Sequence, residues 1–217
     1  MQIDKHITKL EQKIAKFFSA DASGHNIDHL RRTMSYAIEL QKVEGGDLEV
    51  IAVASFIHDV HRIMQSEMGR FVDPKESLPK IRELIADLEL TDKQKTHICH
   101  CIEFHEQYAF GKEKVSVKDI ETLILQDADN LDAIGAIGLI RTIQYSTSKN
   151  IPIYLPDVPL YQNEFSETVH DSSCVHHINN KLLRLGKHMN TKTAKEMAEP
   201  KIKLMQDFID MVVRDWK

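Results

Sequence analysis

The amino-acid sequence predicts an all-α protein, and three observations support this prediction. The chain has 217 residues but only 8 glycines and 6 prolines, so few residues interrupt regular structure. Long segments repeat apolar residues at the i, i+3 and i+4 spacing of a helix that buries one face. No segment shows the alternation of apolar and polar residues that is typical of a half-buried strand. We therefore expect a bundle of helices around a hydrophobic core.

The N-terminal part of the sequence predicts helices that are separated by short polar turns. An amphipathic helix covers about residues 3–18, and a second covers about residues 28–43. The glycine pair at 45–46 ends the second helix. Residues 48–58 are almost entirely apolar, so we expect them to form a central, buried helix.

The middle of the sequence predicts a loop followed by further helices. Residues 60–76 mix charges with a glycine and a proline, and we interpret them as an irregular loop. Residues 77–88 have helical spacing, and Thr91 to Gln94 form a capping box that opens a helix reaching about His105. Another helix is expected to start within Ser116 to Asp119.

This next helix is expected to carry the apolar segment LILQDADNLDAIGAIGLI, residues 123–140. Residues 150–161 contain three prolines and predict a long extended loop. Apolar residues return at helical spacing toward the end of the chain, where we expect one or two closing helices within about 165–217.

The composition limits the classes of function. The chain is 42% hydrophobic, which is enough for one sizeable domain over residues 1–217. Its net charge of −5 gives no general attraction to nucleic acid or to an anionic membrane, so neither partner is expected. Three cysteines do not suit a disulfide scaffold, and no signal peptide or membrane span of about 20 apolar residues is evident. We expect a cytoplasmic protein.

The pair His58-Asp59 is the strongest indication of function. It lies at the end of the apolar run AVASFI, where burying two ionisable groups costs free energy unless they are paired. A divalent cation meets this cost, because imidazole nitrogens and carboxylate oxygens are both metal ligands. His29 lies upstream and Asp129 lies downstream, so the order H, HD, D predicts one shared metal site.

The choice of the last carboxylate is open from the residues alone. Asp127 and Asp129 both lie in the apolar run, and a helix buried all round gives no face to decide between them. Asp132 follows Asp129 by three residues and could orient a ligand through a hydrogen bond.

The segments GHNIDHLRR, SFIHDV and LQDADNLDAIGAIG together resemble the HD-domain metal-dependent phosphohydrolases. More narrowly, the sequence is similar to a small bacterial branch with the signature D-A-D-x-L-D-A-x-G-A-I-G. The C-terminal segment HHINNKLLRLGKHMNTKTAKEMAEPK also resembles that branch. The resemblance therefore extends over most of the chain.

This resemblance implies a single-domain, HD-type helical bundle with the metal-site segments within about residues 25–132. The implied metal ligands are His29, His58, Asp59 and Asp129, since the family's last aspartate follows an alanine. The implied cofactor is a divalent ion, with Mn or Fe favoured over Mg, Co, Ni or Zn. The implied substrate is a small phosphorylated compound, such as a nucleotide, and some members cleave nucleoside triphosphates to monophosphate and pyrophosphate. Relatives of this size often pair, which leaves room for a homodimer.

Further residues are candidates for catalysis and substrate binding. Asp59 is the expected acceptor of a proton from the attacking water, and Arg32 is the first candidate to stabilise charge on a phosphoryl group. Arg62 is a second candidate for phosphate binding, although many relatives have an acid at about this place. His105 is a candidate for substrate or second-metal binding. The alternative to an enzyme is a catalytically weak metal-binding sensor or interaction module.

Overall fold

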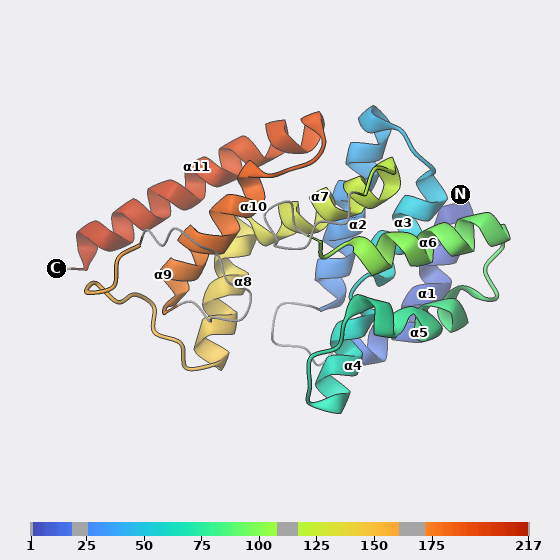
Figure 1. Ribbon diagram of the computed structural model, residues 1–217, viewed down its shortest axis with the longest axis horizontal. Coiled ribbons are helices and arrows are strands. Elements are labelled where there is room, and N and C mark those ends of the chain that lie inside the picture. Colours follow the sequence, from blue (N-terminus) through green and yellow to red (C-terminus); the bar gives the residue numbers. More distant parts are fainter. Residues whose placement is uncertain (1, 19–25, 108–116, 161–171, 217) are drawn as a thin grey trace. The chain divides into compact units, whose positions relative to one another are not determined.

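The computed structural model describes residues 2–18, 26–107, 117–160 and 172–216, and the regular structure in these ranges is entirely helical (Figure 1). The prediction of an all-α fold is confirmed. The described residues divide into two compact units, of which the first ends at Asp129 and the second begins at Asn130. The expectation of a single domain over residues 1–217 stays a prediction.

The first unit is built around one fully buried helix. All residues from Val50 to Ile57 are buried, and this helix contacts α1, α2 and α6. A central buried helix is what the apolar run predicts. The helices of this unit are α1 (Gln2–Phe18), α2 (Ile27–Glu44), α3 (Leu48–Ile57), α4 (Val60–Met68), α5 (Leu78–Ile85), α6 (Asp92–Phe104) and the first part of α7 (Ile120–Ala133).

Polar side chains fix the starts of the helices that carry the candidate site residues. The Asn26 carboxamide oxygen accepts a hydrogen bond from the backbone N–H of His29, which places His29 in the first turn of α2. Thr91 and Gln94 form the predicted capping box of α6. Asp119 accepts a hydrogen bond from the N–H of Thr122 and so opens α7, whereas Ser116 lies outside the described residues.

The interpretation of residues 60–76 as an irregular loop is wrong over much of its length. Residues 60–68 form α4, and Pro74–Ser77 form a short 3-10 turn, η1. Val60 and His61 are buried while Ile63 and Met64 are half-buried, so the segment has an apolar side that the charges obscure. Gly69 ends α4 in a left-handed conformation with φ 65° and does not break the whole segment.

The expected single helix over residues 123–140 is two helices. Helix α7 ends at Ala133, and α8 spans Gly135–Ser148. Gly135 has φ 77°, a conformation that residues with a side chain rarely adopt, so the glycine permits this break. In addition, a Cβ on Gly138 would come within 2.2 Å of the Ala133 carbonyl oxygen.

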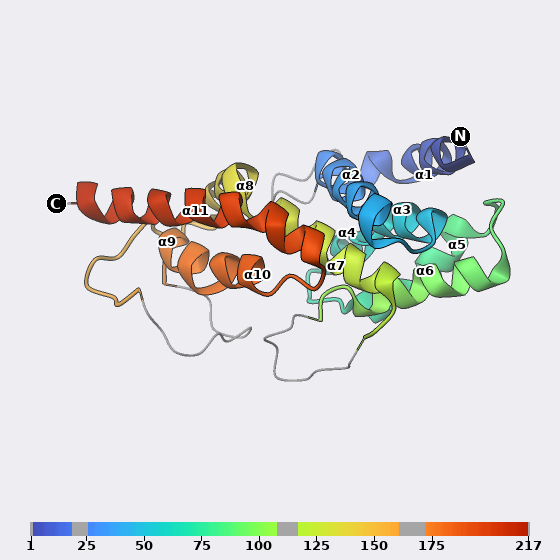
Figure 2. The ribbon, with the colours of Figure 1, turned by 90° about the horizontal axis from the view of Figure 1, so that it is seen from above.

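The second unit carries the C-terminal helices. Helix α9 (Cys174–His177), a π-helical turn η2 (Ile178–Leu182) and α10 (Leu183–Lys187) follow one another, and α11 spans Lys192–Asp215. Figure 2 shows α11 as the longest of the labelled helices, and it contacts α8 and α10. Two closing helical runs agree with the prediction, and the described residues 150–160 are non-helical as expected.

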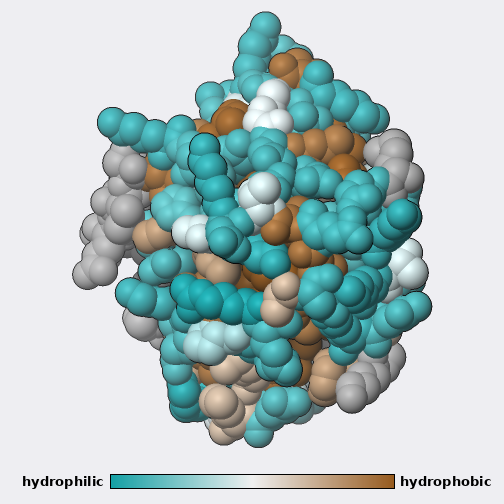
Figure 3. All heavy atoms as spheres, turned by 90° about the vertical axis from the view of Figure 1, so that its right-hand side faces the viewer, coloured by the Kyte–Doolittle hydropathy of each residue, from teal (hydrophilic) through white to brown (hydrophobic). Residues whose placement is uncertain are grey.

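The face of the first unit that carries α1, α5 and α6 is mainly hydrophilic, with small hydrophobic areas between polar side chains (Figure 3). Among the described residues, every helix is too short or too polar to span a bilayer.

Candidate metal centre

The His58-Asp59 pair lies where two helices meet. His58 follows the last residue of α3 in a helical conformation, and Asp59 precedes α4 with φ −88° and ψ 14°. The change of direction between α3 and α4 turns both side chains into the protein, where His58 is 0% and Asp59 is 2% exposed. The end of the buried helix α3 thus places two ionisable side chains in the protein interior.

The structure brings all four residues of the predicted ligand set together. His29 Nε2 lies 3.3 Å from Asp59 Oδ2 and 3.5 Å from Asp129 Oδ1. His58 Nε2 lies 3.6 Å and 3.7 Å from the same two oxygens. The donor atoms come from α2, from the α3–α4 junction and from α7, so the cluster joins segments that are distant in sequence.

These separations fit a shared cation. Metal–ligand distances of about 2.0–2.2 Å place neighbouring ligand atoms about 3.0–3.5 Å apart. The His58 Nδ1 lies 2.9 Å from the Ser55 carbonyl oxygen, so the neutral ring donates there and turns the lone pair of Nε2 toward the carboxylates. This Nε2 is buried and has no hydrogen-bond partner among the described residues. A buried imidazole lone pair facing two carboxylates is what a metal site requires.

Without a cation, a proton on His58 partly neutralises the two carboxylates. Burial lowers the pKa of His58, but the charges of Asp59 and Asp129 outweigh burial and raise the pKa to about 9. For Asp129, burial raises the pKa of the carboxyl, whereas the nearby imidazoles of His58 and His29 lower it overall. The carboxylates therefore attract positive charge into a buried place, either as a proton or as a metal ion.

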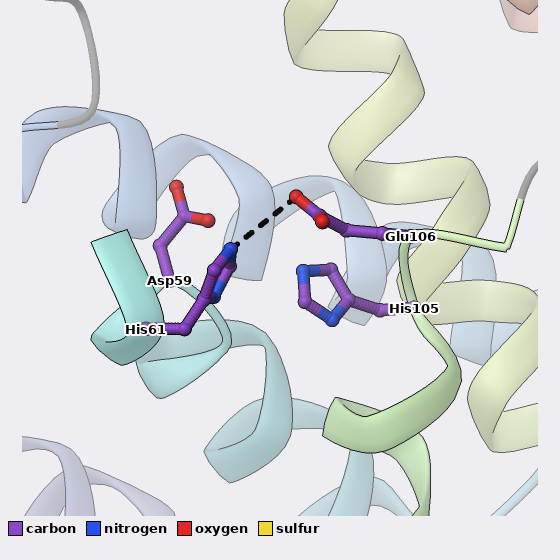
Figure 4. Close-up of side chains that lie close together, drawn as sticks. All are labelled: Asp59, His61, His105 and Glu106. Carbon is purple, nitrogen blue, oxygen red and sulfur yellow. Dashed lines mark ion pairs between the residues drawn. The ribbon is translucent and has the colours of Figure 1, made fainter. Parts of the chain in front are cut away.

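A second group of side chains adjoins this cluster (Figure 4). His61 of α4 and Glu106, two residues after α6, point toward each other, and His61 Nε2 lies 3.3 Å from Glu106 Oε1. His105 projects into the same space and is 2% exposed. One donor atom from each of these three residues and one from Asp59 all lie within 4.8 Å of one another.

The site residues predicted from the sequence include His105 but neither His61 nor Glu106. His61 follows His58 by three residues, which is a signal only if the segment is helical, and the segment is predicted as a loop. Glu106 follows a helix end in a polar segment and carries no distinguishing pattern.

The two candidate arginines differ in their surroundings. Arg62 Nη2 is paired with Glu106 Oε1, and Arg62 Nε lies 3.8 Å from Asp59 Oδ1. Arg32 is half-buried one turn after His29 on α2. Their roles in substrate binding stay predictions.

The two remaining aspartates of α7 differ from Asp129. Asp127 is fully buried, whereas Asp129 supplies an oxygen to the cluster. Asp132 is buried, and its carboxylate forms an ion pair 2.7 Å long with the half-buried Arg141 of α8.

Comparison with known proteins identifies the family. The family model for the HD domain matches residues 26–134, which is half of the chain and contains all four residues of the cluster. The chain belongs to the HD domain family.

Several solved structures resemble the whole chain. A protein from Lactobacillus plantarum is 28% identical with a TM-score of 0.78, covering 100% of this chain and 99% of that one. An HD-superfamily hydrolase from Bacillus thuringiensis is 31% identical with a TM-score of 0.72, covering 99% and 96%. Bacillus subtilis YpgQ in complex with ADP is 27% identical with a TM-score of 0.70, covering 98% and 97%. YpgQ is described as an uncharacterized protein.

Proposed function

We propose that this protein is a divalent-metal-dependent phosphohydrolase that acts on a nucleotide or a related small phosphate compound. The observation that carries the proposal is the convergence of His29, His58, Asp59 and Asp129 at separations of 3.3–3.7 Å. The likeness to an HD-superfamily hydrolase supports hydrolysis, and the complex of YpgQ with ADP supports a nucleotide ligand.

These four residues would hold the cation, with Mn or Fe favoured. When bound, such an ion acidifies a water molecule and polarises a phosphoryl oxygen. Asp59 presents Oδ2 to the imidazoles, while its Oδ1 lies on the side of Arg62. We assign Oδ1 as the acceptor of the proton that the attacking water loses.

More specifically, we propose that the protein cleaves a nucleoside triphosphate to a nucleoside monophosphate and pyrophosphate. The oxygen of water forms a bond to the α-phosphorus, the bond from this phosphorus to the bridging oxygen breaks, and pyrophosphate leaves with the electron pair. Arg32 would stabilise negative charge on the phosphoryl oxygens during this step. Arg62 would contact the leaving phosphates.

A substrate panel tests the proposal. Purified protein is incubated with Mn²⁺, Mg²⁺, Co²⁺ or Ni²⁺ and with nucleoside triphosphates, monophosphates, cyclic nucleotides or an aryl phosphate. We expect metal-dependent release of pyrophosphate or phosphate from a nucleotide. Arg32→Ala should lower kcat/KM about 10-fold or more with unchanged metal content, since it removes a charged contact to the reacting phosphoryl group. Absence of product with every metal would favour the sensor or interaction module.

A further inference from the structure

A cluster of potential ligands on α6 and at the start of α7 is separate from the candidate metal centre. His97 and Cys101 are four residues apart on α6, so both side chains lie on one face of this helix. Asp119 directly precedes α7. One ligand atom from each of these three residues lies within 4.8 Å of the other two. The cluster shares no residue with the candidate metal centre, so it needs an explanation of its own.

The Asp119 carboxylate is oriented toward two imidazoles of α6. Its Oδ1 lies 3.0 Å from His97 Nε2, and its Oδ2 lies 3.1 Å from His100 Nε2. Asp119 Oδ1 also accepts hydrogen bonds from the backbone N–H and the hydroxyl of Thr122, which hold the carboxylate at the start of the helix. Neighbouring hydrogen-bond donors commonly orient a carboxylate that binds a metal ion.

Carboxylates gather around this cluster without a basic partner. Glu121 Oε2 lies 3.7 Å from His97 Nε2, so Glu121 and Asp119 face the same ring nitrogen. Glu121 Oε1 accepts a hydrogen bond from the backbone N–H of Asp47, which brings a third acidic residue to this region. Among the described residues, none of these three carboxylates forms an ion pair with a lysine or an arginine. A bound divalent cation would reduce the repulsion between them.

The donor atoms select the kind of cation. Thiolate sulfur and imidazole nitrogen suit Zn²⁺, whereas Mg²⁺ and Ca²⁺ prefer oxygen ligands. We infer that His97, Cys101 and Asp119 form a Zn²⁺ site with a water molecule in the fourth position. Bonds of about 2.0–2.3 Å separate the ligand atoms of a tetrahedral Zn²⁺ ion by about 3.3–3.8 Å. Side-chain movements of about 1 Å from the present spacing of up to 4.8 Å would close the set.

The cluster can be reached from solvent and has one buried ligand. The side chains of His97 and Asp119 are 28% and 26% exposed, whereas Cys101 is fully buried. An ion can therefore enter from the surface. Because the ligands come from α6 and from the start of α7, the ion would fix these two helices to each other. Asp129 lies ten residues after Asp119 on α7, so Zn²⁺ would stabilise a helix that carries a ligand of the candidate metal centre.

Co²⁺ substitution in the full-length protein tests this inference. A thiolate bound to Co²⁺ gives a charge-transfer absorption band in the near ultraviolet, and the candidate metal centre contains no cysteine. We expect the metal-free, reduced wild-type protein to develop this band with Co²⁺ and to lose it when Zn²⁺ displaces Co²⁺. Cys101→Ser should abolish the band, and His97→Gln should weaken Co²⁺ binding at this site about 10-fold or more. Cys99→Ser is the matched control, since it changes the other cysteine of α6, and it should keep the band.

Thermal unfolding gives an independent readout. In a His58→Ala background, which lacks a central ligand of the candidate metal centre, Zn²⁺ should raise the melting temperature, and adding His97→Gln should abolish this increase. Circular dichroism verifies that each variant keeps its helical content, and the partly exposed His97 provides the test if Cys101→Ser does not fold. A wild-type protein without the band at saturating Co²⁺, or a Cys101→Ser protein that keeps it, would overturn the Zn²⁺ site. Either result would leave the proposed phosphohydrolase unaffected, because other residues hold its metal.

Discussion

His29 Nε2 and Asp59 Oδ2 lie 3.3 Å apart, although one residue is on α2 and the other precedes α4. Both groups are buried, with exposed side-chain fractions of 0% and 3%. The contact depends on α2 packing against α3, which carries the HD pair at its end. The buried core of the first unit thus determines the position of the candidate metal ligands.

Loss of a central ligand should remove the metal. His58→Ala deletes the imidazole that faces both Asp59 and Asp129, and we expect the affinity for Mn²⁺ to fall by about 100-fold or more. Metal analysis after dialysis measures the loss, and circular dichroism should show retained helix. The exposed His188 provides a control, since His188→Ala should keep the metal. Equal metal content in the two variants would count against the site.

The two aspartates of α7 should respond differently to the same substitution. Asp129→Asn removes a charged oxygen that lies 3.5 Å from His29 Nε2, so this variant should lose metal affinity. Asp127→Asn should cost less metal affinity, although it alters a fully buried residue and is expected to lower the melting temperature. Titration with Mn²⁺ distinguishes the two effects. The reverse order of affinities would mean that Asp127 is the ligand.

Metal binding should release a proton near neutral pH. With its pKa raised to about 9, His58 holds a proton at pH 7.5 in the metal-free protein, and a ligand imidazole must be neutral. Calorimetry in two buffers with different ionisation enthalpies should therefore show release of about one proton per ion bound at His58. The release should diminish above pH 9. An enthalpy that is independent of the buffer would contradict this prediction.

The same pKa has a consequence for the stability of the metal-free protein. Because the pKa of His58 is raised above its ordinary value of 6.5, its contribution to stability is complete below that pH. The contribution is lost as the pH rises through 9. Metal-free protein should therefore unfold more readily at alkaline pH, and His58→Ala should reduce this dependence.

Asp119 should stabilise the first unit through α7. It caps the helix through Thr122 and lies 3.0 Å from His97 Nε2, and Asp119→Asn should lower the free energy of unfolding by about 1–2 kcal/mol at pH 7. Burial raises the pKa of this carboxyl, but the hydrogen bonds from Thr122 and His97 outweigh it and lower the pKa to about 2.

The pH dependence of this effect checks its cause. The stabilisation is present above the unfolded pKa of about 4 and is lost as the pH falls toward 2, so wild type and Asp119→Asn should converge in acid. Denaturant titrations at pH 7 and pH 3 measure the difference. Asp92→Asn, at an exposed position on α6, should change stability by less than about 0.5 kcal/mol. A constant difference at both pH values would exclude the carboxylate charge as the cause.

The fold class and much of the helix order could be predicted from local pattern. Apolar spacing and caps such as Thr91 indicate helices because these signals act within a few residues. The prediction fails where charges conceal a half-buried face, as in α4, and where one glycine, Gly135, divides an apolar run. Both features depend on how a segment packs against the rest of the protein. The pattern within one segment does not specify that packing.

The sequence by itself determined the helical class, and its resemblance to the HD-domain proteins named His29, His58, Asp59 and Asp129 as candidates that belong together. Only the tertiary structure decided that His61, Glu106 and Arg62 lie beside them, since these residues come from segments without a shared pattern. The physical reason is that a motif fixes neighbours along the chain, whereas a cluster depends on helix packing, which places donor atoms from distant segments within bonding range.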